Sequence, residues 1–274
     1  MFDTVIEMLS YPFMTRAFLV GSLVALCSAL LGVSLVLKRY SMIGDGLSHV
    51  GFGAMAIAAA MNAAPLTVAI PVVIVAAILL LRISGNAKIK GDAAIALIST
   101  TSLAVGVMVI SLTTGMNTDV YNYMFGSILA MSAEDVKLSL VLSVCVLILF
   151  IVFYHKIFAI TFDETFARAT GVKAGVYNML IAVLTAVTIV LGMRMMGALL
   201  ISSLIIFPAL TSMRVCRTFK SVIINAAVIS VVCLIAGVTL SYVAATPAGA
   251  SVVLANLVMM VLYTVVGAVK NHMR

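Results

Sequence analysis

The chain has 274 residues, of which 64% are hydrophobic and only 9% are charged. Its mean hydropathy is +1.29. A soluble chain of this length carries about one quarter charged residues, because it must cover its surface with polar groups. The composition therefore excludes a soluble protein and predicts a membrane protein that crosses the bilayer several times.

The formal net charge is +7, and the chain has four cysteines. The basic residues are scattered over short loops without an interleaved aromatic stripe, so nucleic acid is not an expected partner. The cysteines show no Cys-x-x-Cys spacing, which argues against a zinc ribbon or a disulfide framework.

Nine apolar segments come close to the roughly 20 residues that a helix needs to cross the hydrocarbon core. The seventh is short, so we predict an all-α polytopic membrane protein of eight or nine spans, forming a single membrane domain over 1–274. Residues 1–14 alternate acidic and apolar positions, and they are expected to form an interfacial helix. The predicted spans are 18–37, 42–61, 65–81, 93–114, 136–154, 176–191, 195–209, 221–245 and 250–269.

The basic residues predict the orientation of these spans. If nine spans alternate and the N-terminus lies outside, most of the Lys and Arg residues fall in inner loops, as the positive-inside rule expects. The C-terminus is then cytoplasmic. The inner set is Lys38, Arg39, Arg82, Lys88, Lys90, Lys156, Arg168, Lys173, Arg214, Arg217, Lys220, Lys270 and Arg274, and the outer set is Arg16, Lys137 and Arg194.

Asp45 and His49 lie four residues apart near the start of the second predicted span. A carboxylate at mid-bilayer costs roughly 2.5–3.5 kcal/mol on insertion scales, so membrane proteins that keep one usually use it for an ion path or pair it. The spacing places both side chains on one helix face, where they can bind a divalent cation together. Two alternatives remain open: Asp45 caps the helix, or His49 bonds to a neighbouring helix.

The longest predicted cytoplasmic loop, residues 155–175, contains a short helical pattern. Thr161 and Glu164 have the spacing of a capping box, and Gly171 suits the end of the helix. Phe162 and Phe166 are expected on one face, where they would dock against another protein. The alternative is that these rings pack under neighbouring membrane helices.

The chain lacks the sequence pattern of a nucleotide-binding P-loop, and it shows neither a catalytic triad nor an H-E-x-x-H site. It is therefore expected to be neither an ATPase nor an intramembrane protease. Arg194 is expected to be an outer-loop charge, either free of function or in contact with a binding protein.

Several blocks resemble one known family in the order in which they occur: LVLKRYSMIGDGLSHVGFGA (35–54), FGSILAMS (125–132), ITFDETFARATGV (160–172), MMGALLISSLIIFPALTS (195–212) and TPAGASVVL (246–254). They are similar to the metal-transporting ABC permeases, known as the ABC-3 family. The resemblance implies a permease fold like that of the vitamin B12 importer. It also implies a homodimer that receives its metal from an extracytoplasmic metal-binding protein and is driven by a separate ATP-binding cassette subunit, which binds the ATP.

The resemblance also assigns roles to residues. Asp45 and His49 match the family motif that lines the metal path, and Phe162, Asp163, Glu164, Ala167 and Gly171 match the coupling helix that contacts the ATPase; Phe166 lies within the same stretch. The expected function is the permease subunit of an ATP-driven importer in the bacterial cytoplasmic membrane. The expected cargo is zinc first, then manganese, then iron, and the chain itself holds no cofactor. A stand-alone secondary carrier that uses the Asp45 carboxylate is the alternative.

Overall fold

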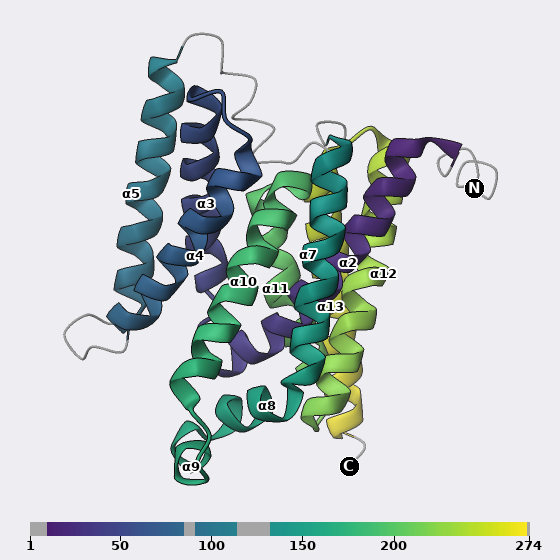
Figure 1. The fold of residues 1–274 in the computed structure, drawn as a ribbon. Coiled ribbons are helices and arrows are strands. Elements are labelled where there is room, and N and C mark those ends of the chain that lie inside the picture. Colours follow the sequence, from purple (N-terminus) through teal and green to yellow (C-terminus); the bar gives the residue numbers. More distant parts are fainter. Residues whose placement is uncertain (1–9, 85–90, 114–131, 273–274) are drawn as a thin grey trace.

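The computed structural model describes residues 10–84, 91–113 and 132–272, and within these ranges the chain folds into α-helices without a β-strand (Figure 1). Residues 1–9 of the predicted interfacial helix lie outside this part of the chain. The helices are α2 (Pro12–Leu37), α3 (Ile43–Ala60), α4 (Pro65–Ser84), α5 (Gly91–Leu112), α7 (Ala133–Val152), α8 (Tyr154–Phe162), α9 (Glu164–Ala169), α10 (Ala174–Met196), α11 (Ala198–Met213), α12 (Phe219–Ala244) and α13 (Ala248–His272).

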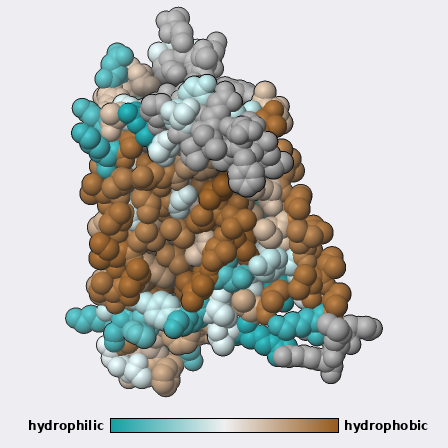
Figure 2. Space-filling model, turned by 90° about the vertical axis from the view of Figure 1, so that its right-hand side faces the viewer, coloured by the Kyte–Doolittle hydropathy of each residue, from teal (hydrophilic) through white to brown (hydrophobic). Residues whose placement is uncertain are grey.

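Eight of the described helices are long and apolar enough to cross a membrane. On the face shown in Figure 2, apolar side chains form a broad band between two rims of hydrophilic residues. The prediction of an all-α polytopic membrane protein is therefore confirmed.

Helix α11 corresponds to the short seventh predicted span. It is 16 residues long and lies inside the bundle. At 1.5 Å per residue it spans about 24 Å, less than the roughly 30 Å of hydrocarbon. The predicted start at Met195 is wrong, because α10 continues to Met196 and the chain turns at Gly197, whose φ is 83°. Residues 12–14 were also placed wrongly: they belong to α2 and not to an interfacial helix.

The helices divide into a central and a peripheral set. In the most apolar 18-residue window of α3, 72% of the residues are buried, compared with 17% in the corresponding window of α13. α2 and α10 are also mostly buried, whereas α5 and α7 expose most of their surface. The exposed side chains of the peripheral helices are apolar, for example Val141 and Ile148 on α7 and Leu262 and Val265 on α13. These faces suit contact with lipid.

Glycines bring the central helices into close contact. A Cβ atom at Gly53 of α3 would lie 2.7 Å from the carbonyl oxygen of Ser102 on α5, and one at Gly32 of α2 would overlap the backbone of Ile205 on α11. Small residues commonly allow membrane helices to approach in this way. At the start of α3, a Cβ atom at Gly44 would lie 3.0 Å from the Ile205 side chain of α11, and one at Gly46 would lie 2.6 Å from the Ile95 side chain of α5, so this end of α3 is also closely packed.

A buried lysine joins the ends of four helices. The Lys38 ammonium, at the end of α2, donates hydrogen bonds to the Ile160 carbonyl oxygen at 3.0 Å, to Asn178 Oδ1 at 2.7 Å and to Glu164 Oε2 at 3.3 Å. Its side chain is only 11% exposed. Asn178 Nδ2 and Arg168 also donate to Glu164, at 3.0 and 2.6 Å. This set of residues, the Lys38 cluster, fixes α8 and α9 to the ends of α2 and α10.

The cluster stabilises the charged form of the Glu164 carboxylate, but it does not stabilise the charged form of the Lys38 ammonium to the same extent. Burial acts to raise the pKa of Glu164, but the hydrogen bonds from Asn178 and Arg168 and the charge of Lys38 outweigh it, and the pKa falls to about 2. Burial lowers the pKa of Lys38, and the nearby Glu164 carboxylate only partly offsets this. The difference arises because the lysine is the more buried partner, whereas the carboxylate receives three donors.

We expect Glu164→Gln to loosen the docking of α9. A carboxylate whose pKa is lowered on folding stabilises the fold above its unfolded pKa of about 4.3, and this contribution disappears as the pH falls toward 2. Because the side chain is about one third exposed, solvent screening limits the effect to roughly 1 kcal/mol. Amide hydrogen exchange over residues 164–172 measures it: protection falls about 5-fold at pH 7, and the difference from wild type shrinks at pH 3.

The matched control is Glu134→Gln, which removes an exposed carboxylate in the first turn of α7. It should leave exchange over residues 164–172 unchanged. Equal protection of wild type and Glu164→Gln at pH 7 would contradict the role given to the Lys38 cluster.

Candidate functional site

Asp45 and His49 lie together in the first two turns of α3. Their Oδ2 and Nε2 atoms are 3.7 Å apart, as the four-residue spacing predicts. The side chains are 45% and 22% exposed, although most of α3 is buried. The pair therefore places one oxygen and one nitrogen ligand atom at an accessible point on a rigidly packed helix.

A third polar group approaches the pair from another helix. The Ser202 hydroxyl of α11 lies 3.5 Å from Asp45 Oδ1 and 3.3 Å from the Ala198 carbonyl oxygen of its own helix. The Ser48 hydroxyl donates to the backbone oxygen of Asp45 at 2.7 Å. Sequence analysis missed Ser202, because it is one of several hydroxyl residues in an apolar run. Only the packing of α11 beside α3 distinguishes it from its neighbours.

The two structural alternatives for this pair do not fit the observed geometry. The residue before α3 is Met42, so Asp45 lies inside the first turn and is not the N-cap. There its charge is favoured by the positive end of the helix dipole. The polar contact that the structure gives His49 is with Asp45 in the same helix rather than with a neighbouring one.

In one copy of the chain the pair is an incomplete set of metal ligands. Within the described ranges, no group of three or more His, Cys, Asp or Glu side chains is close enough to hold a metal. Structural zinc sites have four ligands, and catalytic ones have three protein ligands and an open position. Asp45 and His49 are thus suited to transient contact with a cation, or to a site completed by another molecule.

The segment expected to be one short helix forms two, and the predicted capping box is wrong. Thr161 lies inside α8, where its hydroxyl bonds to the Ile157 carbonyl at 2.7 Å. The break comes at Asp163, which is extended with φ −146° and caps α9 by accepting a hydrogen bond from the Phe166 amide at 2.9 Å. An Asp at this position caps as well as a Thr, so the sequence alone did not separate the two.

The end of α9 is as predicted. Gly171 has φ 84°, its amide bonds to the Arg168 carbonyl, and the Val172 amide bonds to the Ala167 carbonyl. This is the Schellman arrangement, for which a glycine is favoured. Ala167 is fully buried and anchors the short helix.

Phe162 and Phe166 differ in their surroundings because they lie on different helices. The Phe162 ring packs against Phe158 and Phe219, with centroids 5.0 and 5.6 Å apart. Phe162 is nevertheless 59% exposed, so its ring packs on its neighbours and also presents a face outward. Phe166 lies on α9 and is 64% exposed. Helix α9 lies at the lower edge of Figure 1.

Arg194 is not an outer-loop residue. It lies in the last turn of α10, and its guanidinium is 3.8 Å from Asp135 Oδ2 in the first turn of α7. The side chain is 15% exposed. It therefore links two helices at the end of the bundle opposite α8 and α9.

The sequence and the fold match one group of known proteins. ZnuB, the membrane protein of a high-affinity zinc uptake system in Haemophilus influenzae, is 30% identical over 90% of this chain and 94% of its own length. A probable iron transport system membrane protein of the same organism is 33% identical over 88% of this chain and 86% of its own.

A solved structure, PsaBC from Streptococcus pneumoniae in complex with a Fab, superimposes with a TM-score of 0.86 at 27% identity, covering 96% of this chain and 95% of the matched one. The sequence profile of the ABC 3 transport family matches residues 10–267. The chain is therefore a transport membrane subunit rather than an enzyme, and it belongs to the ABC 3 transport family.

Proposed function

We propose that this chain is the permease subunit of an ATP-driven importer for a divalent transition metal, and that Asp45 and His49 contact the metal on its path. The observation that carries the proposal is the accessible pair, with 3.7 Å between carboxylate and imidazole, at the start of the most buried helix. Ionisable residues within membrane spans are rare and commonly mark an ion path.

The chemistry of the pair orders the candidate metals. One carboxylate oxygen and one imidazole nitrogen suit borderline ions such as Zn²⁺ and Mn²⁺, whereas Ca²⁺ and Mg²⁺ prefer shells made of oxygen. We propose zinc first, manganese second and iron third. Similarity does not select among them, because a zinc relative and an iron relative match about equally well.

The exposed α9 supports an ATPase partner. A helix of six residues is too short to be stable alone in water, yet it is capped at both ends and tied to the bundle through Glu164. We propose that the segment containing Phe162, Asp163, Glu164, Phe166, Ala167 and Gly171 is the coupling segment for a separate ATP-binding cassette subunit. Its exposed side chains form the coupling surface, and the buried Ala167 anchors it. A stand-alone carrier would have no use for such a surface.

The remaining partners follow from the same proposal. A permease of this kind receives its metal from an extracytoplasmic binding protein, and its C-terminus lies in the cytoplasm of a bacterial cell. A second copy of the chain related by two-fold symmetry would bring a second Asp45 and His49 to a shared pore. The incomplete ligand set in one copy is consistent with this homodimer.

Removing either ligand should stop transport. Asp45→Asn removes the charge that offsets dehydration of the ion, and His49→Ala removes the nitrogen ligand. We expect metal uptake by vesicles that contain the complete complex to fall at least tenfold in each variant. Competition with unlabelled zinc, manganese and iron in the wild type then ranks the cargo.

The control for these variants is Asp92→Asn, which neutralises an exposed carboxylate in the first turn of the neighbouring α5. It should transport normally. Wild-type uptake in both Asp45→Asn and His49→Ala would remove this pair from the metal path.

The coupling surface makes a separate prediction. Phe166→Asp places a charge at the exposed tip of α9 and should weaken ATPase binding at least tenfold, because buried aromatic residues often dominate such interfaces. Uptake should be lost while the chain still inserts and purifies normally. The comparison variant is Thr165→Asp, which adds the same charge at the adjacent exposed position. Unchanged ATPase stimulation and uptake in Phe166→Asp would exclude Phe166 from the interface.

A further inference from the structure

A cavity of about 400 Å³ opens on the side of α10 that faces the junction of α7 and α8. Its lining divides into a cationic and an apolar half. Lys156 of α8 and Lys173 at the start of α10 supply the charge, Tyr177 supplies a hydroxyl, and Phe153, Val176 and Leu180 supply the apolar walls.

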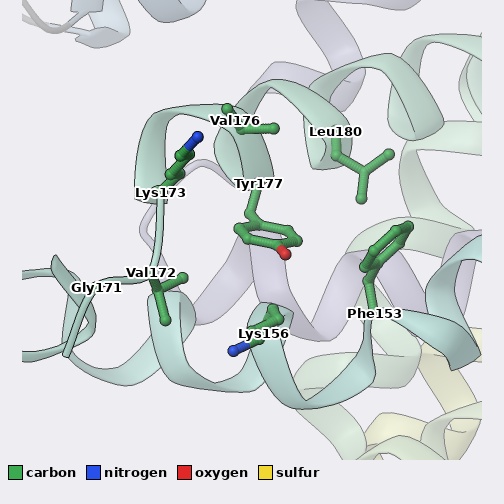
Figure 3. A pocket seen from close by; sticks show the side chains of 8 residues that line it. All are labelled: Phe153, Lys156, Gly171, Val172, Lys173, Val176, Tyr177 and Leu180. Carbon is green, nitrogen blue, oxygen red and sulfur yellow. The ribbon is translucent and has the colours of Figure 1, made fainter.

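Charged and apolar side chains are only partly separated around the cavity. Figure 3 shows Phe153 and Leu180 together on one side. On the other side Lys173 stands beside Val176 and Lys156 lies near Val172, with the Tyr177 ring between the two lysines and its hydroxyl pointing into the space between Lys156 and Phe153. The Phe153 and Tyr177 rings meet edge to face, with centroids 5.7 Å apart, which fixes the apolar wall. The cavity is therefore amphipathic.

The charge of the cavity is not balanced by the protein. No acidic side chain lines it, and neither Lys156 nor Lys173 forms an ion pair with any residue that the structure describes. The start of α10 has no side-chain cap, so the positive end of its dipole adds to the same field. An anionic group is therefore the favoured occupant of the cationic half.

The apolar half continues onto surface that suits lipid. Val176 is 57% exposed, and Ile151 and Val152 in the last turn of α7 are 67% and 65% exposed. Helices α7 and α10 are both candidate membrane spans, and the cavity lies at the end of α7 and the start of α10. A ligand held here places its anionic group beside the lysines and its hydrocarbon along Phe153 and Leu180.

We propose that this cavity binds one anionic phospholipid, with the phosphate between Lys156 and Lys173, a hydrogen bond from Tyr177, and an acyl chain against Phe153, Val176 and Leu180. Basic pockets between membrane helices are known to hold anionic head groups. Because Lys156 is on α8 and Lys173 on α10, the lipid bridges the coupling segment to a membrane span. This bridge supplements the Lys38 cluster.

Native mass spectrometry of the purified full-length chain in detergent tests the proposal. Added phosphatidylglycerol should be retained as one lipid per chain, whereas phosphatidylcholine should not. In Lys156→Gln/Lys173→Gln, retention should fall at least tenfold. The control Arg217→Gln/Lys220→Gln removes two exposed charges, one just before α12 and one in its first turn, and should retain the lipid. Equal retention in both double variants, or equal binding of phosphatidylcholine, would overturn the proposal.

Two further experiments distinguish a lipid from free phosphate, and a lipid from the ATPase subunit, as the occupant of the cavity. Inorganic phosphate and glycerol phosphate at millimolar concentration should not displace the lipid, because they lack the hydrocarbon; full displacement would make this a free phosphate site. The ATPase subunit should bind without releasing phosphatidylglycerol. If it expels the lipid, and the Lys156→Gln/Lys173→Gln variant no longer binds the ATPase, the cavity belongs to the protein interface and the lipid assignment fails.

Discussion

The architecture depends on satisfying one buried ammonium. Lys38 is almost enclosed at the end of α2, so its charge must be compensated within the protein. It is compensated by the carbonyl end of α8, a carboxylate on α9 and an amide on α10. Three helices that meet at one end of the bundle are therefore held by a single side chain, and the α9 tip cannot move far without disturbing the end of α2.

The link from this cluster to Asp45 is short and rigid. After Lys38 the chain turns at Arg39, which has φ 61°, and the amides of Arg39 and Tyr40 bond back to the carbonyls of Val36 and Leu35. This is again a Schellman closure, here with an arginine in the left-handed region, where a side chain costs roughly 1–2 kcal/mol. α3 begins directly afterwards. A short connection therefore runs from α9 through Lys38 to Asp45. Under the proposed function, movement of α9 would be transmitted along it to the Asp45 and His49 pair.

Sequence patterns predicted the features that depend on local rules. Apolar length located the spans, and the four-residue spacing placed Asp45 and His49 together, because a helix fixes that geometry by itself. Gly171 was recognised as a helix end for the same reason. The features that depend on packing were not predicted. Ser202, the Arg194 contact with Asp135 and the Lys38 cluster join residues that are far apart in sequence, and nothing in the local pattern marks them.

The errors also have local causes. The prediction that Thr161 caps the helix is wrong because Asp163, two residues later, offers an equivalent oxygen and is the residue that caps α9. The start of the seventh span failed because apolar residues continue through the turn at Gly197, so hydropathy has no boundary there. The chain turns because Gly197 adopts a positive φ, and the hydropathy of the sequence does not reveal that conformation.

The mechanical connection is tested most directly by Lys38→Met in the reconstituted complex with its ATPase, measured as metal ions taken up per ATP hydrolysed. Methionine keeps the length and apolar stem of the side chain but removes the charge that joins the helices. The account predicts that ATP hydrolysis continues while the ratio falls at least tenfold, and that metal binding to the pair and the ratio in the exposed control Lys220→Met stay unchanged. A wild-type ratio in Lys38→Met would contradict it.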